Sequence, residues 1–293
     1  MKNLVGGRLP LPGRSARRSP RTFGGRLVVI TGAGSGIGRE TALAFAGRGA
    51  RVVVSDVDAA AAERTAAAIT AEGGVAHAYP LDVTDRGAVY AHADTVAAEH
   101  GVPDIVVNNA GIGQAGWFLD TPPEVFERVI AVNLFGVIHG CRAFGAKMVA
   151  RGNGGHIVNL SSMAAYTPQQ SLGAYSTSKA AVFMFSDCLR AEMARHKIAV
   201  STICPGIVHT NIIAKTQFSG LSAAAEEAKR QKFDALYARR RYPPERVAER
   251  IVHAVAAGRA IVPVTPEAHI AYHAHRLVPA LGRWLAARKD VIY

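Results

Sequence analysis

Residues 27–38 have the sequence LVVITGAGSGIG, and this stretch decides the fold of the 293-residue chain. Residues 27–31 are apolar or β-branched, which predicts a short buried strand. The glycines that follow predict a tight turn that opens a helix ending near Arg48. A strand, a glycine-rich turn and a helix in this order predict the first unit of a parallel sheet covered by helices.

The rest of the chain repeats this alternation. Further strands are predicted at 51–56, 76–81, 105–108, 156–161, 198–204 and 260–264. Helices are predicted at 58–72, at 85–100, from Pro122-Pro123 to about Ala150, at 173–196 and from near Pro244. Apolar strands that alternate with helices indicate an α/β fold whose parallel sheet is covered on both faces. We expect one domain over 23–264, a disordered basic tail at 1–22 and a C-terminal extension at 265–293.

The net charge of +12 is concentrated at the two ends of the chain. Residues 1–26 carry seven Lys or Arg and no Asp or Glu, and residues 228–293 carry thirteen against five. Residues 27–227 are close to neutral, with fourteen basic and seventeen acidic residues. A DNA-binding domain carries its basic residues on the folded surface that contacts DNA, so we expect no nucleic-acid partner. For the basic tail, a solvated segment is favoured over contact with anionic lipid or another polyanion.

The cysteine and hydropathy patterns indicate a soluble, cytoplasmic protein. Cys141, Cys188 and Cys204 are widely spaced and form no Cys-x-x-Cys motif, which predicts buried, inert thiols in a reducing compartment. Residues 1–22 contain no continuous apolar run of signal-peptide length. No stretch approaches the roughly 18 apolar residues of a membrane span.

The glycine-rich turn fits a dinucleotide phosphate site. Gly32, Gly36 and Gly38 remove side chains where the chain turns and where backbone approaches a pyrophosphate. The N-terminus of the following helix presents free N–H groups and a partial positive charge to that group. The spacing is Gly-x-x-x-Gly-x-Gly, so the prediction depends on the strand before it and the helix after it.

Asp56, at the end of the second strand, favours NAD over NADP. Its carboxylate can accept both hydroxyls of the adenosine ribose and would repel a 2′-phosphate. Val57 follows it and Ser35 in the turn is uncharged, which leaves Arg39 as the one cation that could favour NADP. The alternative is that Asp56 is a turn residue before the next helix.

Ser162, Tyr175 and Lys179 predict a proton-transfer site beside the nicotinamide. A tyrosine hydroxyl has an ordinary pKa of about 10, too high for a base at neutral pH. Lys179 lies one helical turn beyond Tyr175, and its ammonium, with the positive nicotinamide ring, is expected to lower that pKa. Tyr175 would then exchange the hydroxyl proton of the substrate as hydride moves. Ser162 would hydrogen-bond the substrate oxygen, while Ser161 points to the opposite face of its strand.

In combination, these residues resemble the short-chain dehydrogenase/reductase family over roughly residues 25–264. The shared motifs are Thr31–Gly38, Asn108–Gly111, Asn133, Ser162, Tyr175 with Lys179, and Pro205-Gly206. The resemblance implies a Rossmann-like, doubly wound sheet of about seven parallel strands and an enzyme acting on CH–OH groups. It also implies a homodimer or homotetramer in which helices 124–150 and 173–196 pack against their symmetry mates.

The resemblance also implies a set of cofactor contacts. They are Gly32, Gly34, Ser35, Gly36, Ile37, Gly38, Asp56, Asp82, Val83, Asn109, Ala110, Gly111, Tyr175, Lys179, Pro205, Gly206, Ile207 and Thr210. Asp82-Val83 is expected beside the adenine, and Ile207 and Thr210 at the nicotinamide carboxamide. Asn133 is expected to hold a water linking Lys179 to solvent; the alternative is an asparagine that only packs helices.

The expected substrate is a lipophilic secondary alcohol or its ketone. Candidate wall residues are mostly apolar: Gln114, Trp117, Phe118, Met163, Leu172, Ile207, Phe218, Leu221 and Tyr237. Residues 161–168 and 262–268 are similar to the dehydrogenase half of bacterial epoxide-hydrolase/dehydrogenase fusion proteins, which implies a lipid-type substrate. Sugar-nucleotide epimerisation is disfavoured because the larger C-terminal domain expected for it is missing. A non-catalytic NAD-binding sensor or scaffold would lack the tyrosine or the lysine, and both are present.

The C-terminal segment, about 266–289, predicts a basic amphipathic helix that Pro279 could kink. Its apolar face comprises Ile270, Leu277, Val278, Leu281, Trp284 and Leu285. Such a helix can lie on a membrane surface, although packing on this chain or on a partner subunit is favoured. His269, His273 and His275 lie in the same segment without an acidic partner, so we expect no metal site.

Overall fold

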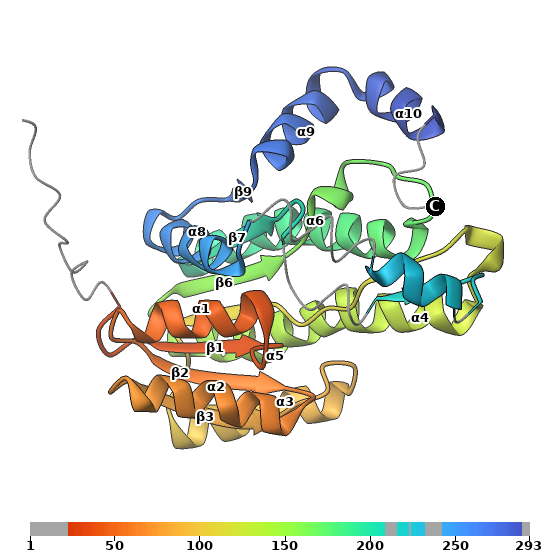
Figure 1. Cartoon of the computed structure of the whole chain (residues 1–293). Coiled ribbons are helices and arrows are strands. Elements are labelled where there is room, and N and C mark those ends of the chain that lie inside the picture. The colour runs from red at the N-terminus through yellow and green to blue at the C-terminus, as the bar shows by residue number, and fades with distance from the viewer. Residues whose placement is uncertain (1–22, 209–215, 223, 232–241, 289–293) are drawn as a thin grey trace, which may run out of the picture.

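A seven-stranded parallel sheet forms the centre of the computed structural model, which describes residues 23–208, 216–222, 224–231 and 242–288 (Figure 1). The strand order is β3-β2-β1-β4-β6-β7-β9. The strands are β1 (Leu27–Thr31), β2 (Arg51–Asp56), β3 (Val75–Pro80), β4 (Ile105–Asn108), β6 (Gly155–Leu160), β7 (Ile198–Cys204) and β9 (Ile261–Pro263). The tail predicted at 1–22 lies outside the described residues.

The order of the strands reverses at β1, which pairs with β2 on one side and with β4 on the other. In register, Ile30 lies beside Val54 of β2 and Val107 of β4. Open parallel sheets bind ligands outside the carboxyl ends of the strands at such a reversal. The fold therefore places a binding crevice directly after Thr31, where the glycine-rich turn begins.

Helices cover both faces of the sheet, as predicted. Val28 and Ile30 pack in one buried cluster with residues of α1 (Gly36–Ala46), α2 (Ala59–Ala71) and α8 (Pro244–Ala257). Leu27 and Val29 pack in the opposite cluster, with α3 (Arg86–Glu99), α5 (Gly136–Arg151) and α6 (Gly173–Met193). Alternate residues of one strand point to opposite faces, so a continuous apolar run such as β1 requires both layers. The structure confirms the predicted α/β fold.

The long helix predicted from Pro122-Pro123 to about residue 150 contains a π-helical turn. It comprises α4 (Pro123–Ile130), the π turn Ala131–Phe135 and α5. Such turns often occur at functional sites, and this one contains Asn133. The stretch Pro123–Arg151 is long and apolar enough to cross a membrane, but 56% of its most apolar window is buried, as in a helix that packs in a core.

A second sheet of two very short strands was not predicted. β5 (Gln114–Ala115) pairs in parallel with β8 (Gln217–Phe218), which joins the loop after β4 to the segment after β7. Two-residue strands give no periodic signal in a sequence. This pairing brings two distant loops to the same side of the sheet.

The C-terminal extension forms two helices, α9 (Pro266–Leu277) and α10 (Pro279–Arg288), with the break at Pro279 that the sequence predicts. In Figure 1 the pair, in blue, stands away from the sheet beyond β9. Among the thiols, Cys141 and Cys204 are buried as expected, whereas Cys188 on α6 is exposed. The prediction that all three thiols are buried was therefore wrong for Cys188.

Candidate active site

A cavity of about 600 Å³ lies at the carboxyl ends of the central strands. It is lined by sixteen of the predicted site residues: Gly32, Ser35, Gly36, Ile37, Asp56, Asp82, Val83, Asn109, Ala110, Gly111, Ser162, Tyr175, Lys179, Pro205, Gly206 and Ile207. Gly34, Gly38 and Asn133 do not line the cavity, and Thr210 is outside the described residues. One cavity thus brings the glycine turn and the Ser-Tyr-Lys set together.

The glycine turn is built by close backbone contacts that no side chain could enter. Gly32 has a φ of +64°, and a Cβ on it would lie 2.7 Å from the Cα of Ala110. A Cβ on Gly38 would lie only 2.2 Å from the carbonyl oxygen of Gly32. Ser35 precedes α1 but its side chain does not cap the helix. The first amides of α1 are therefore available to a phosphate group.

Asp56 lines the end of the cavity next to the glycine turn. Its Oδ2 accepts a hydrogen bond from the backbone N–H of Gly34 at 2.9 Å, and its Oδ1 accepts from Asp58 N–H at 3.0 Å. These bonds hold the carboxylate at the turn, where it can receive hydroxyl donors. Arg39, the cation that could have favoured NADP, forms an ion pair with Glu40 and does not line the cavity.

Asp82 and Arg128 flank the same end of the cavity. The backbone N–H of Thr84, followed by its hydroxyl and the charge of Arg128, holds the pKa of Asp82 below its ordinary value. Arg128 and Val132 line the cavity from the helix before Asn133 and were not predicted. They are four residues apart, so the helical repeat leading to Asn133 is the signal that could have found them.

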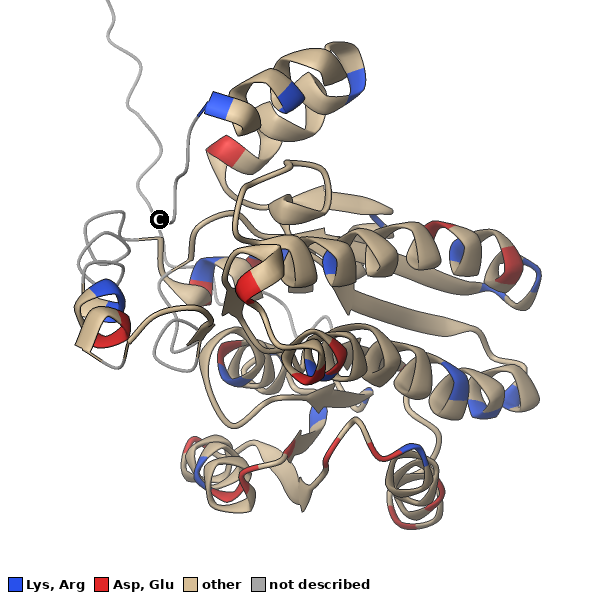
Figure 2. Cartoon of the chain, turned by 90° about the vertical axis from the view of Figure 1, so that its right-hand side faces the viewer, with Lys and Arg blue, Asp and Glu red and all other residues tan. Residues whose placement is uncertain are grey.

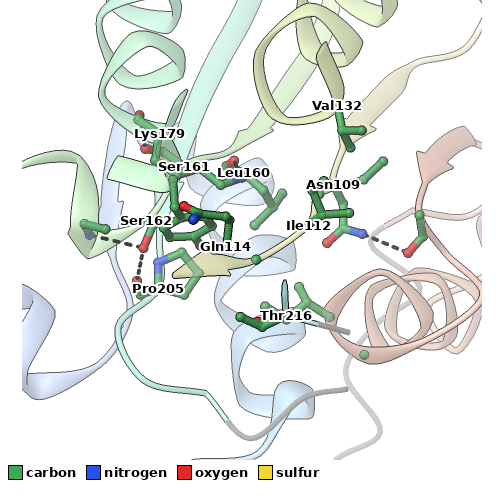
Figure 3. Close-up of a pocket in the computed structure, with 18 of the residues that line it drawn as sticks. Asn109, Ile112, Gln114, Val132, Leu160, Ser161, Ser162, Lys179, Pro205 and Thr216 are labelled. Atoms are coloured by element: carbon green, nitrogen blue, oxygen red, sulfur yellow. Dashed lines mark hydrogen bonds between the residues drawn. The ribbon is translucent and has the colours of Figure 1, made fainter. Parts of the chain in front are cut away.

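Asn109 fixes the turn after β4 to the turn after β1. Its Nδ2 donates to the carbonyl oxygens of Thr31 (3.0 Å) and Gly32 (2.9 Å), as Figure 3 shows in part. The hydroxyl oxygen of Thr31 accepts from the N–H groups of Asn109 and Ala110, at 3.1 and 3.2 Å. The Asn-Asn-Ala-Gly motif therefore shapes the cavity through the backbone of β1.

Ser162, just beyond the carboxyl end of β6, hydrogen-bonds the side chain of Tyr175. The Oγ of Ser162 accepts from Ala164 N–H at 3.1 Å and donates to Pro205 O at 3.4 Å (Figure 3). The Oγ of Ser161 instead donates to Lys179 O at 2.8 Å. Ser162 is thus the serine beside Tyr175, although Ser161 also lines the cavity.

Lys179 lies beneath Tyr175 and is almost fully buried. Its Nζ donates to Leu160 O at 3.0 Å and lies 5.8 Å from the centre of the Tyr175 ring. Burial lowers the pKa of Lys179 to about 8. Burial also raises the pKa of Tyr175 above its ordinary value, and the hydrogen bond with Ser162 opposes this only in part. The expected lowering of the tyrosine pKa is therefore not a property of the chain by itself; the expectation also relied on the positive charge of the cofactor.

Asn133 is fully buried within the π turn. Its Oδ1 accepts from Ile112 N–H at 2.8 Å, and its Nδ2 donates to Ile112 O at 3.0 Å and to Ser178 Oγ at 3.1 Å. This side chain holds the loop after β4 against α6. A Cβ on Gly111 would lie 3.2 Å from Asn133 Oδ1 and 3.4 Å from Lys179 Nζ, so both groups border the space beside this glycine.

Residues 26–219 match the family model described as short chain dehydrogenase. The chain belongs to the short-chain dehydrogenase family. It is 59% identical over 259 residues to the protein named "Probable oxidoreductase EphD" of Mycobacterium tuberculosis, a match that covers 88% of this chain and 44% of EphD. The chain thus spans less than half the length of that curated relative, as expected for a resemblance to one part of a fusion protein.

Two solved structures of this family have the same fold. A short-chain dehydrogenase/reductase from Burkholderia phymatum in complex with NAD has a TM-score of 0.82 and is 28% identical, covering 89% of this chain and 96% of that one. A 7α-hydroxysteroid dehydrogenase in complex with NADH and 7-oxo glycochenodeoxycholic acid has a TM-score of 0.71 and is 31% identical, covering 83% and 93%. The chain is therefore an oxidoreductase of the short-chain dehydrogenase type.

Glu267 is a residue of this dehydrogenase's cavity that the sequence did not indicate. Its Oε1 accepts from Ile207 N–H at 3.1 Å. A Cβ on Gly206 would lie 2.7 Å from the same oxygen and 2.2 Å from Thr265 Oγ1. The first turn of α9 therefore packs directly on the Pro205-Gly206-Ile207 loop. The domain boundary predicted after residue 264 falls between these two parts of one site.

The remaining wall of the dehydrogenase cavity is mainly apolar. Of the candidate wall residues, Gln114, Met163, Leu172, Ile207 and Phe218 line the cavity. Gln114 is buried, and its Nε2 donates to Thr121 Oγ1 at 3.2 Å. Trp117 and Phe118 are exposed and Leu221 does not line the cavity, while Tyr237 lies outside the described residues. Within the described part of the chain, no group of three His, Cys, Asp or Glu side chains could hold a metal ion.

Proposed function

We propose that this dehydrogenase interconverts a lipophilic secondary alcohol and its ketone, with NAD as the hydride carrier and Tyr175 as the general acid/base. The observation that carries the proposal is one cavity lined by the glycine turn, Asp56, Ser162, Tyr175 and Lys179. Every group that alcohol oxidation requires from the protein thus borders the same space. A non-catalytic NAD sensor would have no need for a buried lysine beneath a tyrosine.

The proposed choice of NAD rests on Asp56. Two backbone N–H groups fix its carboxylate at the turn, where ribose hydroxyls could donate to it and a 2′-phosphate would be repelled. The cradle around Gly32 and Gly38 has no room for side chains, which suits a pyrophosphate lying on the backbone. The Burkholderia phymatum relative, whose structure is a complex with NAD, supports the same choice.

In the proposed mechanism, the bound nicotinamide supplies the hydride acceptor or donor. Ser162 and Tyr175 would hold the substrate oxygen between them, and Tyr175 would take the hydroxyl proton during oxidation or return it during reduction. The ammonium of Lys179, 5.8 Å from the tyrosine ring, would stabilise the phenolate. Because burial disfavours an isolated phenolate, this lysine charge is essential to the proposal.

The water relay from Lys179 through Asn133 is part of the proposal. The approach of both groups to Gly111, within 3.4 Å of a Cβ position, supports it. The engagement of the Asn133 side chain with Ile112 and Ser178 supports a second role, in which it holds the loop after β4.

The proposed lipophilic substrate rests on the composition of the wall. Met163, Leu172 and Phe218 line the same cavity as Ser162 and Tyr175. Among the described lining residues, the only Lys or Arg side chains are Lys179, beneath Tyr175, and Arg128, beside Asp82. Neither is placed to bind a substrate carboxylate. The 7α-hydroxysteroid dehydrogenase relative, whose structure holds 7-oxo glycochenodeoxycholic acid, supports a lipid-like substrate.

A homo-oligomer in the cytoplasm completes the proposal. Phe135 and Met184, on the long helices expected to meet symmetry mates, are 48% and 61% exposed in the single chain. Burying such side chains in a subunit interface would be favourable.

Titration with NAD(H) and NADP(H), followed by fluorescence or calorimetry, is the first test. We expect tighter binding of NAD(H), weakened by Asp56→Ala, and turnover of lipophilic secondary alcohols that Tyr175→Phe abolishes. Binding of neither cofactor would contradict the enzymatic proposal. Binding of NAD(H) without turnover of any alcohol or ketone would favour the sensor or scaffold.

A further inference from the structure

The two C-terminal helices, Pro266–Arg288 and here called the C-terminal hairpin, expose an unusual amount of apolar surface. Six large apolar side chains are between 43% and 80% exposed: Ile270, Leu277, Val278, Leu281, Trp284 and Leu285. Leu281, Trp284 and Leu285 are spaced three and four residues apart, so they share one face of α10. Monomeric proteins rarely leave such a group of apolar side chains in water without a partner.

The hairpin is nevertheless anchored to the body of the protein along its other side. The hydroxyl of Tyr166 donates to Ala268 O at 3.1 Å, and its ring meets the ring of Tyr272 edge-on at 5.5 Å. A Cβ on Gly282 of α10 would lie 3.9 Å from Pro168. These contacts make the hairpin a fixed platform, with one side on the 163–168 loop and the apolar side facing solvent.

The charges on the platform all have one sign. From residue 268 to residue 288 there is no Asp or Glu, while Arg276, Arg283 and Arg288 are exposed. In Figure 2 the charged positions along the hairpin are blue, with red only at its first turn. The guanidinium of Arg288 lies 4.1 Å from the centre of the Trp284 ring. Apolar side chains bordered by arginines, with a tryptophan among them, are typical of helices that lie in a membrane interface.

We propose that the C-terminal hairpin docks this dehydrogenase on an anionic membrane surface. A second copy of the chain is a poorer occupant, because a two-fold contact would bring the same arginines on both copies together. Anionic headgroups would pair with Arg276, Arg283 and Arg288 while the apolar side chains enter the acyl boundary. This assigns the surface to lipid, where the sequence pattern alone favoured packing against protein.

The position of the hairpin also sets which end of the cavity faces the lipid. Tyr166 and Pro168, which hold the hairpin, lie in the loop between Ser162 and Leu172, and Gln169 of this loop lines the cavity. Docking would therefore place the substrate end of the cavity beside the membrane, where a lipophilic alcohol is concentrated. This last step rests on the proposed function; the docking itself does not.

Co-sedimentation of the full chain with vesicles tests the docking. We expect binding to phosphatidylcholine vesicles containing phosphatidylglycerol, weakening as salt is raised, and little binding to phosphatidylcholine alone. Replacing Arg276, Arg283 and Arg288 by Gln should reduce the partition coefficient on the order of a hundredfold. The matched control replaces the exposed Arg64, Arg86 and Arg195, which changes net charge equally and should leave most of the binding. Equal losses in both variants would overturn the proposal.

A second pair of variants tests the apolar face without using charge. Leu281→Gln with Trp284→Gln should abolish vesicle binding, whereas Val75→Gln, at the opposite edge of the sheet, should not. In a Trp117→Phe background, emission from Trp284 should shift to the blue on binding. Thermal unfolding of each variant checks that it remains folded. None of these measurements depends on cofactor binding or on turnover. Two results together would overturn the proposal: the wild type does not bind vesicles, and the hairpin variants have a lower oligomeric mass in sedimentation. The apolar surface would then be a subunit interface.

Discussion

At each end of the cavity a carboxylate accepts a hydrogen bond from a backbone N–H group. The two contacts differ in how far apart the bonded residues lie in the sequence. Asp56 accepts the backbone N–H of Gly34 at 2.9 Å, and Glu267 accepts the backbone N–H of Ile207 at 3.1 Å. The first contact joins residues 22 apart within one strand-helix-strand unit, whereas the second joins residues 60 apart. Glu267 also belongs to α9, whose outer face is exposed. The Asp56 contact is therefore formed locally, whereas the Glu267 contact depends on how the C-terminal hairpin is seated.

Substitution of Tyr175 tests whether both ends serve one reaction, and it should have the largest effect. Tyr175→Phe keeps the ring beside Lys179 and removes the proton carrier, so kcat should fall by about 10²- to 10⁴-fold. The Kd for NAD(H), measured by calorimetry, should stay unchanged because the cofactor contacts at both ends remain.

Tyr166→Phe is the matched control for this variant. Its hydroxyl donates to Ala268 O rather than into the reaction, so its loss should cost about 1 kcal/mol of stability and little kcat. Comparable kcat losses in both variants would contradict the assignment of Tyr175.

Acid should destabilise the folded protein by protonating a buried histidine, His92, which contacts the strand that carries Asp56. His92 Nε2 lies 2.9 Å from Ser55 Oγ, and burial lowers the pKa of His92 to about 4. The unfolded chain takes up the proton near pH 6.5, whereas the folded chain resists it. The stabilisation is complete above that pH and should be lost between about pH 6.5 and 4, by up to about 3 kcal/mol.

Urea unfolding at several pH values between 7 and 4 checks this prediction. His92→Asn should reduce the pH dependence of the free energy of unfolding, while His253→Asn, at an exposed position, should leave it unchanged. His156, whose pKa burial also lowers to about 4, should add a similar slope in every variant. If the free energy of unfolding of His92→Asn falls with pH as steeply as that of the wild type, protonation of His92 does not destabilise the cofactor end.

Removal of the Asp56 carboxylate tests the local end of the cavity. Asp56→Ala should weaken NAD(H) by roughly 10- to 100-fold, because a charged acceptor for ribose hydroxyls and for Gly34 N–H is lost. Asp58→Ala, two residues on, removes the cap that accepts Ala61 N–H at 3.0 Å and an exposed ion pair with Arg64. It should cost about 1 kcal/mol of stability and leave NAD(H) affinity intact, as calorimetry and unfolding can show.

The same division between local and distant contacts explains what the sequence could predict. Strands 27–31, 51–56, 105–108 and 198–204 have the predicted bounds, because each is an apolar run ended by turn residues. The π turn at Asn133 was missed because the apolar pattern runs through it, and β5 with β8 because two-residue strands leave no pattern. Glu267 was missed because nothing near residue 267 in the chain points back to Ile207. Sixteen of the residues assigned to catalysis and to cofactor binding line one cavity, and the roles of all of them stay predictions until variants are assayed.

Removal of the Glu267 carboxylate tests the distant end and should have the smallest effect. Glu267 is a positioning residue, since it acts on the cofactor through the Pro205-Gly206-Ile207 loop. Glu267→Ala should lower kcat about tenfold, with a smaller change in the Kd for NAD(H), because the loop beside the reacting ring loses one charge-assisted hydrogen bond. Glu267→Gln keeps an acceptor for Ile207 N–H and should recover most of that loss.

Two further variants separate this role from a general weakening of α9. Gly206→Ala places a Cβ 2.7 Å from Glu267 Oε1 and should lower kcat in the same direction as Glu267→Ala. Glu245→Ala removes an exposed carboxylate from the first turn of α8, away from the cavity, and should leave kcat unchanged. If Glu267→Ala changes only the unfolding midpoint and not kcat, then α9 covers the site without positioning it. Asp56 and Glu267 would then share the same kind of hydrogen bond but not a role in the reaction.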